Sequence, residues 1–350
     1  MNALAAKPEA EPAPGPGASA DVRWLEVDDS HAGQRLDNFL LRQLKGVPKS
    51  HVYRIVRSGE VRVNKARASP DRRLDVGDQV RIPPVRVAEP QRAGPVVPQT
   101  FPILFEDAAL LAIDKPAGVA VHGGSGVDSG VVERLRAARP NAPLLELVHR
   151  IDRETSGVLL LAKKRSALTA MHAALREGRV RKRYRLIVSG HWSGGPRALR
   201  FPLHKFHTAE GEHRVVVRDG GQEAGTRVRP LGLLTHPRLG PFSVLEADLE
   251  TGRTHQIRVH LAHVGHPIAG DPKYGNFILN RQLDRERHRR MFLHAASIGF
   301  RNPADGRDVA VASPPPEAFT RFVQACQPAE ALRAADGGAP GEHRKNLEST

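Results

Sequence analysis

Cysteine is almost absent from this 350-residue sequence, which contains only Cys326. A single cysteine excludes an intrachain disulfide and any zinc site built from several thiolates, so we expect a thiol without a role. Long hydrophobic runs are also absent. No stretch reaches the roughly 18 to 20 apolar residues of a membrane span, and the first residues lack the apolar core of a signal peptide. We therefore expect a cytoplasmic protein that does not enter a membrane.

Acidic residues are scarce relative to basic ones. The sequence has 53 Lys and Arg against 38 Asp and Glu, a formal net charge of +15, and its pI is near 10.6. Such an excess predicts attraction to a polyanion, with nucleic acid the first candidate and an anionic membrane surface the second. The length allows two or three domains with a sizeable core.

Three segments have the composition of chain that cannot bury enough apolar surface to fold. Residues 1–21 are rich in Ala, Pro, Gly and Glu, and residues 327–350 have the same character. We predict a disordered leader and a disordered tail there. Residues 87–99 hold several Pro and Gly without strand or helix period, which predicts a linker. Domains are then expected at 22–86 and 100–326.

The smaller predicted domain is strongly basic, with 13 Lys and Arg against 5 Asp and Glu between Gly33 and Arg86. Apolar residues recur at helical spacing after Arg35, and again after Lys49, where Ser50 can cap a helix. Residues 59–65 and 74–82 alternate like strands. Basic side chains on this frame can meet RNA phosphates, and we name as RNA-binding candidates Lys49, Arg54, Arg57, Arg62 and Lys65. The arrangement resembles the S4 RNA-binding domain.

The most informative run in the larger domain is residues 149–157, which places Asp152 between arginines and ahead of an apolar stretch. A carboxylate shielded from water needs a cation beside it, because desolvation favours its neutral form. Asp152 is therefore the first candidate for catalysis. The simpler interpretation is a surface ion pair before a buried strand.

Other segments add candidates. Residues 103–106 and 110–114 predict a hairpin, and a helix capped by Ser166 should place Met171 in the core. Residues 180–188 alternate so that Arg181, Arg183 and Arg185 share one face while Tyr184 lies on the other.

Residues beyond Gly252 predict a helix carrying His255 and Arg258 on one face. The nearby histidines lack a metalloprotease spacing, so we predict no metal. The glycine-rich run 123–126 lacks the dinucleotide and P-loop spacings, so we predict a mobile loop and no nucleotide cofactor.

Together, residues 149–157, 182–188, 251–263, 270–275 and 293–295 resemble the pseudouridine synthases of the large-subunit ribosomal RNA type. The resemblance runs from about Gly33 to Cys326, and Ile151 is the one departure noticed in the core motif, where Leu is usual. It implies an α+β catalytic domain with a mainly antiparallel mixed sheet, behind a small S4-like α+β domain. It also implies a cofactor-free monomer that isomerises specific uridines of 23S ribosomal RNA. The implied site consists of catalytic Asp152, Tyr184 and Arg258, with Arg150, Leu293 and His255 binding the substrate.

The residue chemistry agrees with that implication. Forming pseudouridine breaks the bond from N1 to the ribose, rotates the uracil and rejoins it through C5. Asp152 can attack C1' or take a C2' proton, Arg258 can keep it ionised, and Tyr184 can relay or position the C5 proton. The target base must first leave its stack, and Arg150 can fill the vacated space.

Two other functions remain open on the sequence. Asp152 and Glu154, roughly 7 Å apart on one side of an extended strand, are compatible with a hydrolytic glycosidase. Alternatively, the S4-like module binds RNA and the larger domain is a noncatalytic scaffold.

Overall fold

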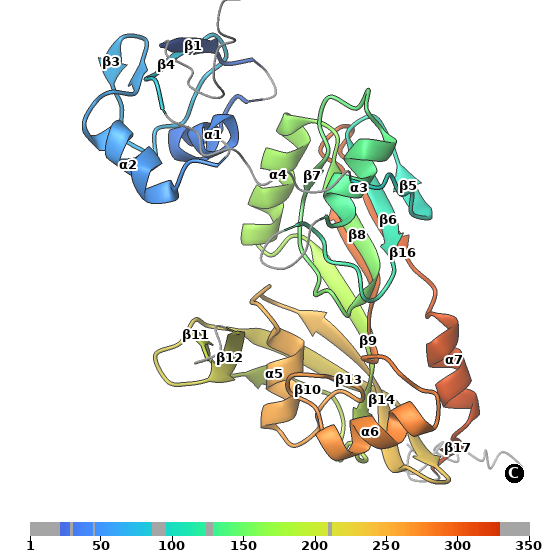
Figure 1. Ribbon diagram of the computed structural model, residues 1–350. Coiled ribbons are helices and arrows are strands. Elements are labelled where there is room, and N and C mark those ends of the chain that lie inside the picture. The colour runs from blue at the N-terminus through green and yellow to red at the C-terminus, as the bar shows by residue number, and fades with distance from the viewer. Residues whose placement is uncertain are drawn as a thin grey trace, which may run out of the picture. The chain divides into compact units, whose positions relative to one another are not determined.

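The computed structural model describes residues 22–28, 31–44, 46–85, 96–123, 129–208 and 212–329. The chain divides into two compact units, Met1–Pro95 and Val96–Thr350 (Figure 1). The leader, the glycine-rich run from residue 124 onward, residues 86–95 of the predicted linker region and the tail beyond Ala329 lie outside the described residues. Their predicted disorder or mobility stays a prediction. Within the described part, no helix is long and apolar enough to cross a membrane.

Within its described residues, the first unit contains two helices and a four-stranded sheet of order β1-β4-β2-β3. Its elements are β1 (Arg23–Glu26), α1 (Leu36–Gln43), α2 (Lys49–Arg57), β2 (Arg62–Val63), β3 (Ala66–Arg67) and β4 (Gln79–Ile82). The apolar stripes of both helices are buried in one core with Val63, Val80 and Ile82. The two predicted helices and the α+β class are confirmed.

Local details of this unit differ from the prediction. Helix α2 is capped by Pro48 and already includes Lys49, so Ser50 lies inside the helix instead of capping it. Both strands are shorter than predicted. Asn64 and Lys65 take positive φ angles of 50° and 66° and turn the chain into β3, and a turn at Gly77, with φ of 85°, precedes β4. Strand β1 was not predicted; it pairs with β4.

The second unit is built on a sheet of eleven strands. Its main path runs β10-β13-β14-β9-β15-β8-β6-β5, and every neighbouring pair on it is antiparallel except β15 with β8. The first strands and helices are β5 (Ile103–Glu106), β6 (Leu110–Lys115), α3 (Val131–Ala138), β7 (Glu146–Leu147), β8 (Ser156–Ala162), α4 (Arg165–Arg176) and β9 (Arg181–Ser189). The next are β10 (Arg197–Arg200), β11 (Leu203–His207), β12 (His213–Val217), β13 (Gly225–His236), β14 (Gly240–Leu249) and α5 (Gln256–His263). The last are α6 (Phe277–Arg285), β15 (Leu293–Arg301), β16 (Asp308–Ala312), α7 (Glu317–Gln324) and β17 (Gln327–Pro328).

The sheet buries apolar side chains on both faces. Leu159 and Leu161 of β8 and Tyr184 and Leu186 of β9 share one cluster with residues of α3 and α5. The alternate β8 residues pack with α4, where Met171 is in the core as predicted. Helices α6 and α7 cover Ile187 of β9 from that second side. The period of two along each strand therefore separates a face with α3 and α5 from a face with α4, α6 and α7.

Two glycines allow backbones to approach closely beside the site. Gly157, with φ of 109°, lies where β8 begins its parallel pairing with β15, and a Cβ there would lie 2.2 Å from the Ala295 carbonyl oxygen. Gly270, with φ of 74°, lies against the Arg290 carbonyl. Larger residues do not fit at either position, because both the space and the left-handed φ require glycine.

The C-terminal boundary also differs from the prediction. The disordered tail was expected from Gln327, but Gln327 and Pro328 form β17 and pair with Thr235 and Leu234 of β13. At the other end, Gln99 of the predicted linker accepts a hydrogen bond from Arg134 of α3 through its side chain. Both segments gain backbone or side-chain partners that their composition does not reveal.

Candidate active site

Asp152 lies in the turn between β7 and β8. The backbone N–H of Thr155 donates to the Asp152 carbonyl over 3.1 Å, so this stretch is a turn and not the extended strand that we expected. The roughly 7 Å separation inferred for Asp152 and Glu154 assumed an extended chain and loses its basis. Glu154 instead lies near Arg153, with 3.6 Å between carboxylate and guanidinium.

A fully buried lysine, Lys115, donates hydrogen bonds that hold the backbone of this turn. The Lys115 ammonium donates to the carbonyl oxygens of Pro116, Val119 and Arg153 at 2.8, 2.8 and 3.0 Å. Burial lowers the pKa of Lys115 to about 8, although the nearby carboxylates of Glu154 and Asp152 favour its charged form. The sequence analysis did not identify Lys115 as a structural residue. The feature of the sequence that could have identified it is a lysine at the end of an apolar strand.

Arg258 is the cation that pairs with Asp152. Its Nη1 donates to Asp152 Oδ2 over 2.9 Å, and the Arg258 side chain is only 3% exposed against 25% for Asp152. Arg258 lies in the first turn of α5. The fold therefore brings it into contact with Asp152, although the two residues are 106 positions apart in the sequence. Arg153, the sequence neighbour, donates instead to the Gly118 carbonyl.

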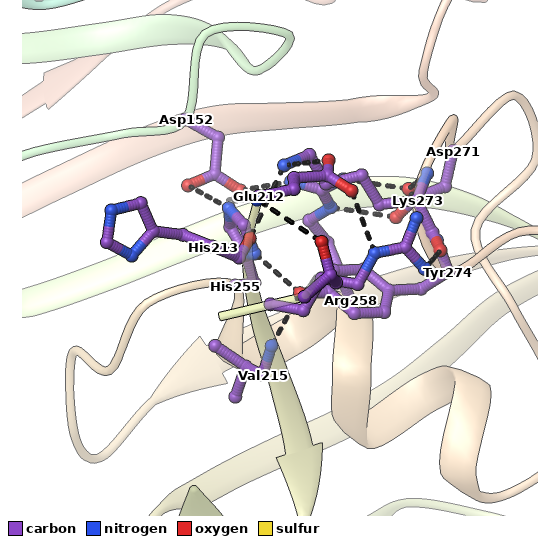
Figure 2. Close-up of polar contacts among 11 residues, drawn as sticks. Asp152, Glu212, His213, Val215, His255, Arg258, Asp271, Lys273 and Tyr274 are labelled. Atoms are coloured by element: carbon purple, nitrogen blue, oxygen red, sulfur yellow. Dashed lines mark hydrogen bonds and ion pairs between the residues drawn. The ribbon is translucent and has the colours of Figure 1, made fainter. Parts of the chain in front are cut away.

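A second carboxylate, Asp271, holds the other side of the same guanidinium. Arg258 Nε and Nη2 donate to its two oxygens at 2.7 and 2.8 Å, a bidentate pair inside the protein (Figure 2). The backbone N–H groups of Lys273 and Tyr274 also donate to Asp271, and Asn280 of α6 donates to its carbonyl. All three nitrogens of the Arg258 guanidinium therefore donate to a carboxylate oxygen. Sequence reasoning treated residues 270–275 as a turn and did not identify Asp271.

The charges of this pair reinforce each other. Burial opposes the charge of Arg258, yet hydrogen bonds and attraction from Asp271, together with Asp152, hold the pKa of Arg258 above its usual value. Burial likewise opposes ionisation of Asp271, and the guanidinium of Arg258 lowers the pKa of Asp271 below its usual value. The site thus holds a permanent cation with two carboxylates on different sides.

His255 stands at the start of α5 and faces the second oxygen of Asp152. Its Nε2 lies 3.9 Å from Asp152 Oδ1, and its Nδ1 is 2.7 Å from the hydroxyl of Tyr274. That hydroxyl accepts from the Val215 N–H of β12, so its own proton is available to Nδ1. Burial lowers the pKa of His255 to about 4, which keeps the ring neutral near pH 7.

Tyr184 and Leu293 lie on neighbouring strands of the face that carries α5. Tyr184, 6% exposed, is opposite Ala247 of β14 and Ala295 of β15. Burial raises the pKa of Tyr184, and the Asp152 carboxylate raises it further, so the phenol stays protonated. Leu293 belongs to the same core cluster. Arg150, two residues before Asp152, is exposed.

The predicted RNA-binding residues lie in the first unit. Lys49, Arg54 and Arg57 are on α2, Arg62 is on β2 and Lys65 is in the following turn, and all five are exposed. The predicted RNA-binding residues and the predicted catalytic residues therefore belong to different units.

The histidines near α5 make hydrogen bonds to the protein. His260 contacts Thr226 Oγ1 and the Phe201 carbonyl, each at 3.0 Å, and His266 contacts the Ser189 carbonyl. Across the described residues, no group of three or more His, Cys, Asp and Glu side chains is arranged to hold a metal ion.

Comparison with known proteins agrees with this geometry. A family model for RNA pseudouridylate synthases matches residues 109–263, and an S4 domain model matches residues 34–80. The protein named ribosomal large subunit pseudouridine synthase C of Pasteurella multocida (strain Pm70) is 47% identical over 299 residues, covering 84% of this chain and 90% of that protein. Its namesake in Escherichia coli (strain K12) is 46% identical over 311 residues, covering 87% and 96%.

A solved structure shares the fold at lower similarity. Human RNA Pseudouridylate Synthase Domain Containing 1 aligns with a TM-score of 0.54 and 24% identity, covering 73% of this chain and 100% of that one. The matches extend across both units, and the family model spans Asp152, Tyr184 and Arg258. The chain belongs to the RNA pseudouridylate synthase family and is an isomerase that converts uridine in RNA to pseudouridine.

Proposed function

We propose that this enzyme modifies specific uridines of large-subunit (23S) ribosomal RNA, in the cytoplasm and as a monomer. The proposal is supported by the names of the relatives, which are ribosomal large subunit pseudouridine synthases, and by the match to an S4 domain. The net charge of +15 suits a large polyanionic substrate. The exposed basic side chains of α2 and β2 supply the RNA contacts of the first unit.

One observation carries the mechanism: Arg258 occupies only one oxygen of Asp152. Oδ2 accepts a hydrogen bond from Arg258 Nη1, whereas Oδ1 faces His255 Nε2 at 3.9 Å, which is too far for a hydrogen bond. The pair therefore engages Oδ2 and leaves Oδ1 to react. Oδ1 either attacks C1' of the ribose or takes the C2' proton, and both routes release the uracil from C1'.

The remaining steps need no electron transfer, because the C1'–N1 bond is replaced by a C1'–C5 bond and the C5 proton moves to N1. No cofactor is required for that balance. Burial and the Asp152 carboxylate raise the pKa of Tyr184 and keep it a neutral phenol, so its oxygen accepts the C5 proton while its own hydroxyl proton passes on to N1. Leu293 packs against the uracil ring, and His255 orients the ribose next to Oδ1.

Arg150 acts on the RNA before chemistry. It is exposed and two residues from Asp152, so it enters the stack as the target nucleotide turns out. Extruding a base costs a few kcal/mol in a duplex, and a cation that fills the gap offsets part of that cost.

The test uses Asp152→Asn and wild-type enzyme on ribosomal RNA from a deletion strain, with pseudouridine mapped at single-nucleotide resolution. We expect wild type to restore defined sites and Asp152→Asn to lose at least about 10³-fold in rate. RNA mass must stay constant; release of free uracil would instead identify a glycosidase. Pseudouridine formation by Asp152→Asn at the wild-type rate would refute the assigned role, and no pseudouridine from either protein would favour the scaffold.

A further inference from the structure

The face of the sheet opposite Tyr184 carries a cluster of arginines that the reaction does not use. We define this arginine face by its six members on strands β9, β10 and β13: Arg181, Arg183, Arg185, Arg200, Arg227 and Arg229. Strand pairing aligns them, because Arg185 and Arg229 both lie opposite Glu246, and Arg183 and Arg227 both lie opposite Asp248. Their alternate neighbours point into the core beneath the catalytic site.

Solvent reaches the arginine face. The side chains of Arg200 and Arg227 are each 69% exposed, that of Arg229 is 56% exposed and that of Arg183 is 49% exposed. Helices α6 and α7 cover Ile187 and Phe242, further along the same face. The cluster is therefore an open surface and not part of an interior ion network.

Three carboxylates pair with four of the six guanidinium groups and leave the cluster positively charged. Glu246 accepts from Arg229 at 2.7 Å and lies 3.4 Å from Arg183. Glu250 accepts from Arg227 at 2.6 Å and from Arg200 at 3.4 Å. Asp248 accepts from Arg183 at 3.3 Å. The face keeps an excess of three positive charges.

Two members, Arg181 and Arg185, have no ion pair within the part of the chain that the structure describes. Both are exposed on β9, and with Arg183 they form a row with roughly 7 Å between successive side chains. The face contains arginine and no lysine, and guanidinium forks bind phosphate with two parallel hydrogen bonds. A row of exposed arginines that keeps an excess of positive charge fits a phosphodiester backbone.

We propose that the arginine face binds the backbone of a structured segment of the substrate RNA, on the side of the sheet away from the target uridine. This inference rests on the proposed function, since the RNA is the ribosomal substrate. The enzyme then contacts its RNA on both faces of the catalytic sheet. One face performs the reaction, and the other contributes affinity that does not depend on base sequence.

The test compares the full-length Arg181→Ala/Arg185→Ala variant with wild type. One probe is a protein-free transcript of full-length large-subunit ribosomal RNA, and the other is a short hairpin carrying a uridine that wild type modifies. For the transcript, we expect affinity at about 0.1 M monovalent salt to fall at least about tenfold, and the slope of log K against log salt to decrease by about 2. The single-turnover rate on saturating hairpin should not change.

Two controls sharpen the result. Arg289→Ala/Arg307→Ala removes the same charge from two loop side chains that are 88% and 80% exposed, and should retain the wild-type slope. Arg181→Lys/Arg185→Lys keeps the charge and should recover most of the slope. Thermal unfolding should be unchanged in the Arg181/Arg185 variants, because these two side chains make no ion pair within the described residues.

Each other outcome contradicts the inference. If the affinity for the transcript and the slope of log K against log salt are unchanged, the arginine face consists only of solvent-exposed ion pairs between strands and does not bind RNA. A defect that appears with ribonucleoprotein particles but not with naked transcript would identify a protein partner. Failure of wild type to modify any RNA would refute the proposed function separately, because the binding measurements do not depend on turnover.

Discussion

At the scale of single residues, the site depends on one guanidinium held between two carboxylates. Asp152 leaves one oxygen without a hydrogen bond from Arg258, while Asp271 takes two of the Arg258 nitrogens. Asp271 does not touch the substrate in this arrangement. We infer that its role is to position Arg258, because a buried cation needs a fixed partner.

We predict that Asp271→Asn slows single-turnover pseudouridine formation about 100-fold, because a displaced Arg258 no longer holds Asp152 in place. The Kd for RNA should stay near the wild-type value, since Asp271 is completely buried. Asp284→Asn, on the exposed side of α6, is the matched control. A variant that binds RNA normally and turns over at the wild-type rate would remove Asp271 from the mechanism.

Sequence reasoning found some of these residues and not others for a physical reason. Asp152 stands out because its neighbours are charged in front of an apolar strand. Asp271 lies in a segment that reads as a turn, and its side chain does accept from the N–H groups two and three residues ahead, as turn-forming Asp residues do. Its ion pair depends on tertiary structure. Arg258 was named through family resemblance and not through its spacing.

At the scale of secondary-structure elements, α5 begins at an unusual residue. His255 takes a left-handed φ of 54°, and its ring connects the start of α5 to Tyr274 and approaches Asp152. Periodicity predicted the helix but not this start. The predicted strands of the first unit were too long for a related reason: turns at Asn64 and Lys65 and at Gly77 interrupt an alternation that looked continuous.

We predict that acid destabilises the protein partly through the start of α5. The pKa of His255 is about 4 in the folded protein, and an unfolded histidine titrates near 6.5, so the unfolded state binds more protons between these values. The stability contributed by the neutral His255 ring is fully present above about pH 6.5 and is lost as the pH falls towards 4. His255→Asn, which tolerates the left-handed φ, should show a shallower fall in Tm between pH 7 and 5.

The control for this prediction is His204→Asn, an exposed histidine on β11. It should reproduce the wild-type dependence of Tm on pH. A wild-type slope in His255→Asn as well would assign the acid sensitivity to other buried histidines, such as His149, whose pKa is also about 4 because of burial.

At the scale of the whole molecule, the residues proposed for the reaction and those proposed for RNA binding by the first unit belong to different units. All residues assigned to the reaction lie in the second unit, and the first has its own core. The α+β class, the mainly antiparallel sheet and the S4 domain follow from strand alternation and family resemblance. The parallel pair of β15 with β8 could not be predicted, because it joins strands 138 positions apart at Ser156 and His294.

We predict that a chain starting at Val96 still forms pseudouridine on a short hairpin, but binds ribosomal RNA more weakly. The salt dependence of its binding should be flatter, because exposed basic residues of α2 and β2 are lost. Filter binding over a salt series and single-turnover assays measure the two effects separately. Equal loss on hairpin and full-length RNA would show that the first unit supports catalysis directly.

The 106 positions between Asp152 and Arg258 also bear on synthesis of the protein at the ribosome. A growing chain exposes Asp152 well before α5 and Asp271 have emerged, and contacts so distant in sequence form late in folding. Until then Asp152 lacks the guanidinium of Arg258. We therefore expect unfinished chains to be inactive towards the ribosomal RNA around them, and activity to appear only when nearly the whole second unit has been made.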